Sequence, residues 1–262
     1  MDRPTTTDRR FWGDLDDPWV AEIAAAMPDG AIVEGCAGDL PEAIPAATSS
    51  WVVHRAIPSK ADLDRLAAWA GSTPRPRVLA ILGPHARHFH WEWVANLVDR
   101  VMPEATAAEV LGRWLGVDRP RPARRPSVAV VASGPALREV LVAMAEAAGY
   151  DATGSRSWAD AAHAPIAVWD APTLDEGWEA QLARESKARK VVALLAFADR
   201  ATVRAARDAG ARAVLDLPVE PDDLAFALDR VAAQLGERPH RVPPAPRHAS
   251  RPSTVVDGVG PS

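Results

Sequence analysis

The chain has 262 residues, of which 48% are hydrophobic and 25% are charged, and its formal net charge is -5 at pH 7. This composition suits a globular protein of about two domains, and the negative charge excludes a general attraction to nucleic-acid phosphates. The single cysteine, Cys36, excludes an internal disulfide, and no apolar run approaches the roughly 20 residues of a membrane helix, so a cytoplasmic location is expected.

The first segment, residues 1–118, contains two short apolar runs that predict buried strands. These runs are WVVHRAIP (Trp51–Pro58) and RVLAIL (Arg77–Leu82). Three acids stand near the start of the chain: Asp14, Asp16 and Asp17. Leu15 and Pro18 interrupt them, and no clear first strand precedes them. The segment is therefore expected to be a diverged α/β domain.

Histidines gather after the second run, in the segment GPHARHFHWEW. The candidate metal ligands are His85, His88, His90 and Glu92. Imidazole and carboxylate groups bind Zn²⁺, and His54 would join them if the strand ends converge. Such a cluster is more often polar packing at a surface or interface. We therefore expect no bound zinc and keep a metal-dependent enzyme as an alternative.

Two proline-rich segments divide the chain. Residues 119–126 (RPRPARRP) disfavour helices and central strands. Residues 237–262 have many prolines and few large apolar side chains, so disorder is expected there. The predicted organisation is a first domain over 1–118, a linker over 119–126, a second domain over 127–236 and a tail over 237–262.

Strand-like and helix-like stretches alternate within residues 127–236. The predicted strands are 127–132, 151–155, 165–169, 191–197 and 213–217. The predicted helices begin at Gly134-Pro135, Trp158, Leu174, Asp199 and Pro221. Five strands that alternate with helices predict a parallel, doubly wound sheet covered on both faces.

The run VVALLAFADRATVRAARDAGARAVLDLPVEPDDL (Val191–Leu224) resembles the last third of a response-regulator receiver domain. It contains a strand, a helix, the turn Gly210-Ala211, a second strand, and Pro218 before a helix that opens with acids. Asp170, in VWDAP at the end of the third predicted strand, matches the phosphoacceptor aspartate of that family. The resemblance covers residues 127–236 and implies the receiver fold.

The same resemblance implies that most of the phosphorylation chemistry is missing. Receivers bind Mg²⁺ with an acidic pair after the first strand, where this chain has Ala132 and Ser133. The family's hydroxyl residue, lysine and aromatic switch correspond to Leu195, Leu217 and Val214. The vestigial phosphoacceptor pocket comprises Asp170, Ala132, Ser133, Leu195, Leu217 and Pro218. Hydrocarbon cannot neutralise an acyl phosphate, so we expect no bound Mg²⁺; an atypical regulator that is phosphorylated on Asp170 is the alternative.

The first segment repeats the plan of the second. Two pairs of stretches run parallel: Arg77–Leu82 with Lys190–Leu195, and Val98–Leu115 with Val214–Val231. In this register Arg55 stands where the second copy has Asp170, and an arginine cannot accept a phosphoryl group. We therefore expect two doubly wound, flavodoxin-like and receiver-like parallel-sheet domains in tandem.

Protein contacts are the output that these features favour. In the receiver family, the face formed by the fourth helix, fifth strand and fifth helix commonly pairs with itself or with a partner. The resemblance implies an interaction face with Val214 and the surface charges Arg204, Arg207, Arg212 and Asp229. No helix-turn-helix pattern follows Gly236, so DNA binding is not expected. The expected function is a non-catalytic, phosphorylation-independent signalling or scaffold protein that binds a protein partner or itself, with no membrane contact.

Overall fold

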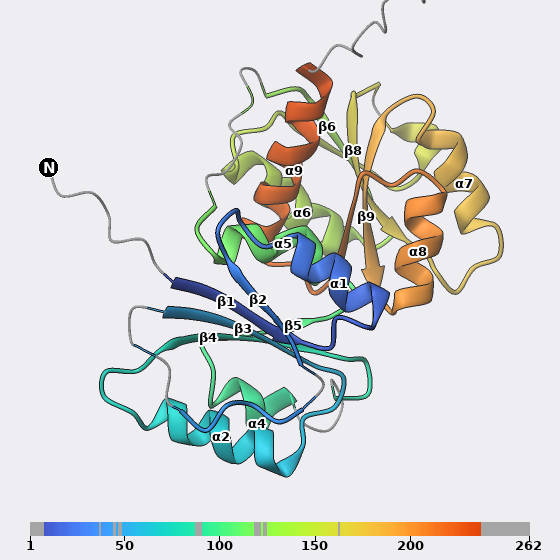
Figure 1. Ribbon diagram of the computed structural model, residues 1–262. Helices are drawn as coiled ribbons and strands as arrows, with labels where there is room; N and C mark the ends of the chain where they lie inside the picture. Colours follow the sequence, from blue (N-terminus) through green and yellow to red (C-terminus); the bar gives the residue numbers. More distant parts are fainter. Residues whose placement is uncertain are drawn as a thin grey trace, which may run out of the picture.

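The computed structural model describes residues 8–36, 38–43, 46, 49–86, 91–117, 122, 125–161 and 163–236. Two five-stranded parallel sheets form its framework, and helices flank each sheet (Figure 1). The elements from β1 (Asp8–Gly13) to α5 (Ala107–Trp114) are termed the first unit, and those from β6 (Val128–Val131) to α9 (Pro221–Gly236) the second unit. Among the described residues, no helix has both the length and the apolar character needed to cross a bilayer.

The first unit orders its parallel strands β2-β1-β3-β4-β5. The strands after β1 are β2 (Ile32–Gly35), β3 (Ser49–Arg55), β4 (Arg77–Leu82) and β5 (Arg100–Pro103). The helices before α5 are α1 (Pro18–Ala25), α2 (Lys60–Ala70) and α4 (Trp91–Ala95). The side chain of Asp17 accepts a hydrogen bond from the backbone N–H of Trp19 and so fixes the start of α1.

The second unit orders its parallel strands β10-β9-β8-β6-β7. The strands after β6 are β7 (Ala152–Ser155), β8 (Ile166–Ala171), β9 (Lys190–Ala196) and β10 (Ala213–Leu217). The helices before α9 are α6 (Pro135–Ala147), the short 3₁₀ helix Trp158–Asp160, α7 (Trp178–Glu185) and α8 (Arg200–Asp208). Asp199 and Thr202 form a capping box that sets where α8 begins.

Both sheets have the same strand order, 2-1-3-4-5, when each is numbered from its own first strand. This is the flavodoxin-like order, which receiver domains share. The predicted fold class, two doubly wound parallel-sheet units of receiver-like topology, is therefore confirmed. The predicted disordered tail lies outside the described residues.

Three local predictions were wrong. A strand, β1, does precede the acids near the start; its first three residues are polar and half-buried, so it lacks an apolar run. The helix predicted from Leu174 begins only at Trp178, because Leu174 is 99% exposed and Gly177 has a φ of 82°, which is not helical. Strand β8 continues to Ala171 and therefore includes Asp170.

The two units share one apolar core. Helices α2 and α4 cover one face of the first sheet, while α1 and α5 cover the other and lie between the two units (Figure 1). Helix α5 contacts α9 and β10 of the second unit. One buried cluster extends from Phe11 and Trp19 in the first unit to Leu228 and Val231 in the second. The contact between the units is thus part of the core of the protein.

Candidate functional site

The predicted acceptor residue, Asp170, lies near the carboxyl edge of the second sheet. On β8 it stands opposite Leu194 of β9, while the preceding Trp169 pairs with Val131 of β6. Ala132 and Ser133 directly follow Val131, so the structure brings them to the same edge as Asp170. Ligands of open α/β sheets bind at this edge, so a phosphoacceptor pocket would lie here.

Leucine side chains occupy the predicted pocket positions on β9 and β10. Leu195, one residue beyond the partner of Asp170 on β9, is fully buried. Leu217 ends β10 opposite Ala196 and is followed by Pro218 through a cis peptide bond. Neither leucine side chain offers a hydroxyl or an ammonium group to an acyl phosphate.

The carboxyl group of Asp170 is half-buried, and burial raises its pKa above the ordinary value. Within the described part of the chain it has neither a hydrogen-bond donor nor an ion-pair partner. Burial therefore makes ionisation of Asp170 less favourable than that of an exposed aspartate.

A receiver-type Mg²⁺ site does not fit these residues. Mg²⁺ requires several oxygen ligands in nearly octahedral geometry, and receivers supply two of them from acids after the first strand. Here the carbonyl of Ala132 instead accepts a hydrogen bond from Nη1 of Arg138 at 2.8 Å. Over the described ranges, no group of three or more His, Cys, Asp or Glu side chains is placed to hold a metal ion.

The corresponding edge of the first sheet carries a buried ionic network that links the two units. His54, near the end of β3, donates from Nε2 to Oε2 of Glu104 at 2.8 Å. Arg200, at the start of α8, donates to both oxygens of Glu104 at 2.7 and 2.9 Å. The same guanidinium lies 2.7 Å from Asp17. The side chains of His54 and Glu104 are only 5% and 3% exposed.

Glu104 stays ionised in this network. Burial by itself would raise its pKa, but the hydrogen bonds from His54 and Arg200 outweigh burial and lower the pKa to about 2. A bidentate arginine–carboxylate pair is among the strongest polar contacts in proteins.

This network predicts a specific pH dependence. The pKa of Glu104 is about 2 in the folded protein and 4.5 is the ordinary value for a glutamate, so its stabilising effect is complete above pH 4.5 and is lost as pH falls toward 2. The loss amounts to about 3 kcal/mol of unfolding free energy. Urea unfolding at a series of pH values should show that Glu104→Gln loses less unfolding free energy on acidification than the wild type does. Glu179→Gln, which changes an exposed glutamate on α7, should retain the wild-type loss; equal losses in all three proteins would contradict the assignment.

The network leaves no room for a substrate. The cavity beside Glu104 and Arg200 measures about 10 Å³, which is at the lower limit for one water molecule. Gly83 lies in its wall, where a Cβ atom would come within 2.6 Å of the carbonyl oxygen of Ala56. The second unit therefore closes the edge of the first sheet at Glu104, and the network there joins the units.

The predicted interaction face of the second unit meets the first unit of the same chain. The guanidinium carbons of Arg200, Arg204 and Arg207 lie 5.9, 5.7 and 5.5 Å from the ring centroid of Trp19. Arg207 also pairs with Glu22 and Glu109. Arg204 and Arg207 thus take part in a contact within the chain, and Arg212 is exposed.

Asp229 is not the surface charge that was predicted. It is 0% exposed, and its carboxylate accepts a hydrogen bond from the hydroxyl of Tyr150. Helix α9 packs against α6, which turns Asp229 toward the inside of the unit. Val214 is likewise 0% exposed because β10 is covered by helices, so its side chain is not available to a partner.

A second group of ion pairs strengthens the contact between the units. Arg100 on β5 and Arg113 on α5 both donate to Asp223 in the first turn of α9, at 2.8 and 2.6 Å. Arg100 also bonds Glu220, and Arg113 also bonds Asp222. The acids at the start of α9, where the helix dipole favours negative charge, therefore also bind arginines of the first unit.

The predicted histidine cluster is only partly described. His85 is exposed in the loop after β4, and Glu92 is exposed on α4. His88 and His90 lie outside the described residues. His54, which was considered as an additional ligand, is instead bonded to Glu104.

No clear signal in the sequence predicts the partnership of Glu104 and Arg200. Glu104 follows β5 and His54 is the penultimate residue of β3, so the convergence of strand ends at one edge was the available hint. Arg200 comes from the other unit, and its role depends on how the two units pack.

Comparisons with known proteins found similarity only among solved structures: no protein-family model and no curated protein matched. A pilus assembly-related protein of Burkholderia pseudomallei is 25% identical over 43% of this chain and 93% of its own, with a TM-score of 0.39. A pilus assembly protein of Burkholderia thailandensis is 27% identical over 41% and 98%, with a TM-score of 0.37. The C-terminal region of RcsC from Escherichia coli, with a linker region and a phosphoreceiver domain, is 15% identical over 90% and 96%, with a TM-score of 0.37. These TM-scores are below 0.5, so the fold assignment rests on strand order and register.

Proposed function

We propose that the chain is a non-catalytic signalling or scaffold protein that works through protein contacts and without phosphorylation. The observation that carries this proposal is the carboxyl edge of the second sheet. There Asp170 stands with the side chains of Ala132, Ser133, Leu195 and Leu217 and with no described ionic partner. A carboxylate so placed has no positioned cation or donor to stabilise phosphoryl transfer.

The contact between the units supports a scaffold role. Receiver-like units that signal by pairing through the fourth helix, fifth strand and fifth helix need that face free. In this chain, Arg204 and Arg207 of α8 contact Trp19 of the first unit, and α9 contacts α5. We infer that the tandem acts as one body and binds its protein partner through other surfaces.

Phosphodonor treatment tests the proposal directly. The full-length protein is incubated with acetyl phosphate and Mg²⁺, and its intact mass is measured. The expected result is no added phosphoryl group on the wild type and no difference from Asp170→Asn. A phosphoryl group that is present on the wild type and absent from Asp170→Asn would overturn the proposal and favour an atypical regulator.

A gain-of-function variant provides the matched control. Ala132→Asp, Ser133→Asp, Leu195→Thr and Leu217→Lys together restore the groups that receivers use. This variant is expected to accept a phosphoryl group on Asp170 under the same conditions, provided that circular dichroism shows it folded. Acceptance by this variant alone would demonstrate that the missing side chains, rather than the fold, prevent phosphorylation.

A further inference from the structure

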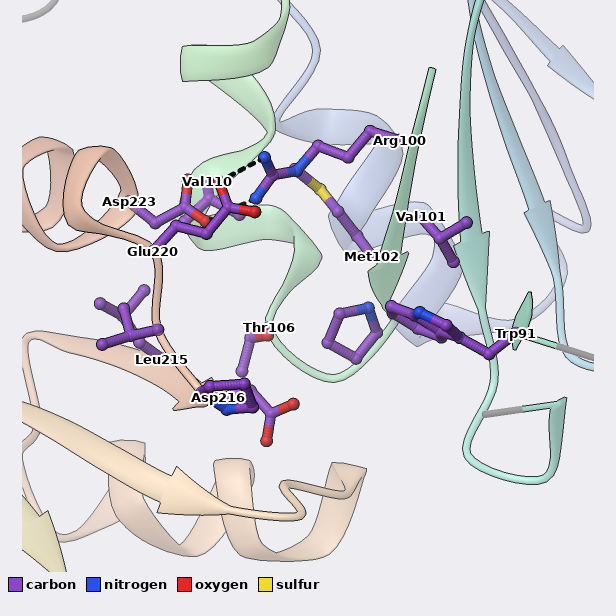
Figure 2. A pocket seen from close by; sticks show the side chains of 13 residues that line it. Trp91, Arg100, Val101, Met102, Thr106, Val110, Leu215, Asp216, Glu220 and Asp223 are labelled. Carbon is purple, nitrogen blue, oxygen red and sulfur yellow. Dashed lines mark hydrogen bonds and ion pairs between the residues drawn. The ribbon is translucent and has the colours of Figure 1, made fainter. Parts of the chain in front are cut away.

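A cavity of about 270 Å³ lies between the two units (Figure 2). The first unit lines it with residues of α4, β5 and α5, and the second unit with the end of β10 and the loop that leads to α9. Its volume corresponds to about nine molecules of liquid water. It is thus slightly smaller than typical drug-sized pockets and large enough for a small organic molecule.

Most of the cavity wall is apolar. The principal apolar residues are Trp91, Met102, Val110, Leu215, Pro218 and Val219. Figure 2 shows the indole ring of Trp91 coming from the first unit and the carboxylate of Asp216 from the second. An aromatic or branched hydrocarbon body would therefore find contact surface on both units.

The hydroxyl of Thr106 lies in this wall and makes no hydrogen bond within the described part of the protein. The residue is only 4% exposed and stands at the N-cap of α5, but its side chain makes no capping hydrogen bond. The hydroxyl oxygen is not among the buried side-chain atoms that lack a partner, so it is open to the cavity. A ligand atom in the cavity can therefore hydrogen-bond to it.

The charged groups of the wall favour a positive ligand. Three carboxylates, those of Asp216, Glu220 and Asp223, line the cavity, and two guanidinium groups, those of Arg100 in the lining and Arg113 beside it, pair with Glu220 and Asp223. Arg100 already donates to Glu220 at 2.6 Å and to Asp223 at 2.8 Å. The lining thus has more negative than positive groups, and an anionic ligand would meet repulsion.

We propose that this cavity binds a small primary amine with an apolar, aromatic or branched body. The ammonium group faces the carboxylates and donates a hydrogen bond to the hydroxyl of Thr106, while the hydrocarbon body packs against Trp91 and the apolar wall. Because the wall comes from both units, the ligand holds them together and stabilises the folded tandem by an amount that rises with the logarithm of its concentration once this exceeds the dissociation constant. This binding site does not depend on the state of Asp170.

Calorimetric titration of the full-length protein tests the proposal, with tryptamine as the probe and indole-3-propionate as its acidic counterpart. Tryptamine is expected to bind with a submillimolar dissociation constant, and the acid about tenfold more weakly or not at all. Thr106→Val, which removes only the hydroxyl, is expected to weaken tryptamine binding about five- to tenfold. Thr153→Val makes the same change on the exposed side of β7, away from the cavity, and is expected to leave binding unchanged.

Val219→Trp fills the cavity and is expected to abolish binding, with circular dichroism used to verify folding. If this variant does not fold, the comparison of Thr106→Val with Thr153→Val decides. Lack of tryptamine binding by the wild type, equal binding of the acid, or unchanged binding by Thr106→Val would each overturn the proposal.

Discussion

Replacement of Arg200 by alanine is expected to lower the free energy of unfolding by about 3–5 kcal/mol. The variant leaves the carboxylate of Glu104, which is 3% exposed, with His54 as its remaining side-chain partner and deprives Asp17 of its cation. It also removes one of the guanidinium groups that lie near Trp19. Urea unfolding of the full-length protein, followed by far-UV circular dichroism, measures the change.

Two further variants complete the test: one separates the charge of Arg200 from its bidentate geometry, and the other is a control. Arg200→Lys keeps the charge but loses the bidentate geometry, so an intermediate loss is expected. Arg212→Ala removes an exposed arginine of the same unit and is expected to change stability by less than about 0.5 kcal/mol. Similar effects of Arg200→Ala and Arg212→Ala would show that the network contributes little.

The second large effect is expected for Trp19→Ala, with a loss of about 4 kcal/mol. Trp19 is 6% exposed and belongs to the core cluster that spans both units. Its indole N–H donates to the carbonyl oxygen of Glu104 at 3.1 Å, so the substitution removes a hydrogen bond as well as a large apolar side chain.

Chemical unfolding of the wild type and of a control variant shows how this loss arises. Leu174→Ala, which shortens a side chain that is 99% exposed, is the matched control and is expected to be nearly neutral. The wild type is expected to unfold in one transition because its two units share a core. Two separate transitions in the wild type, or a neutral effect of Trp19→Ala, would contradict a core that couples the units.

These predictions place the first unit in a role that the family resemblance did not suggest. The pairing face of a receiver is usually discussed as a site for another molecule, whereas here α8, β10 and α9 meet a neighbouring unit of the same chain. Charged residues on such a face affect the choice of partner more than affinity. Arg207 forms such charge pairs with Glu22 and Glu109 of the first unit.

The sequence alone determined the architecture of the second unit. Its apolar runs are long and its turns carry clear signals, so the strand Ala213–Leu217 matched the prediction in full, and α8 was expected to begin at Asp199, which caps it. The alternation of strands and helices then permitted few topologies other than a doubly wound parallel sheet. The absence of the receiver's acids, hydroxyl and lysine also followed from residue identity.

Only the tertiary structure decided which charges are buried and which of them meet. Asp229 sits on a helix whose sequence does not reveal its packing partner, and the structure turns it toward Tyr150. Glu104 and Arg200 are 96 residues apart, so their contact depends on the docking of two separately specified units. Local periodicity records which face of an element is apolar, but contacts between distant polar side chains depend on how complete units pack against each other.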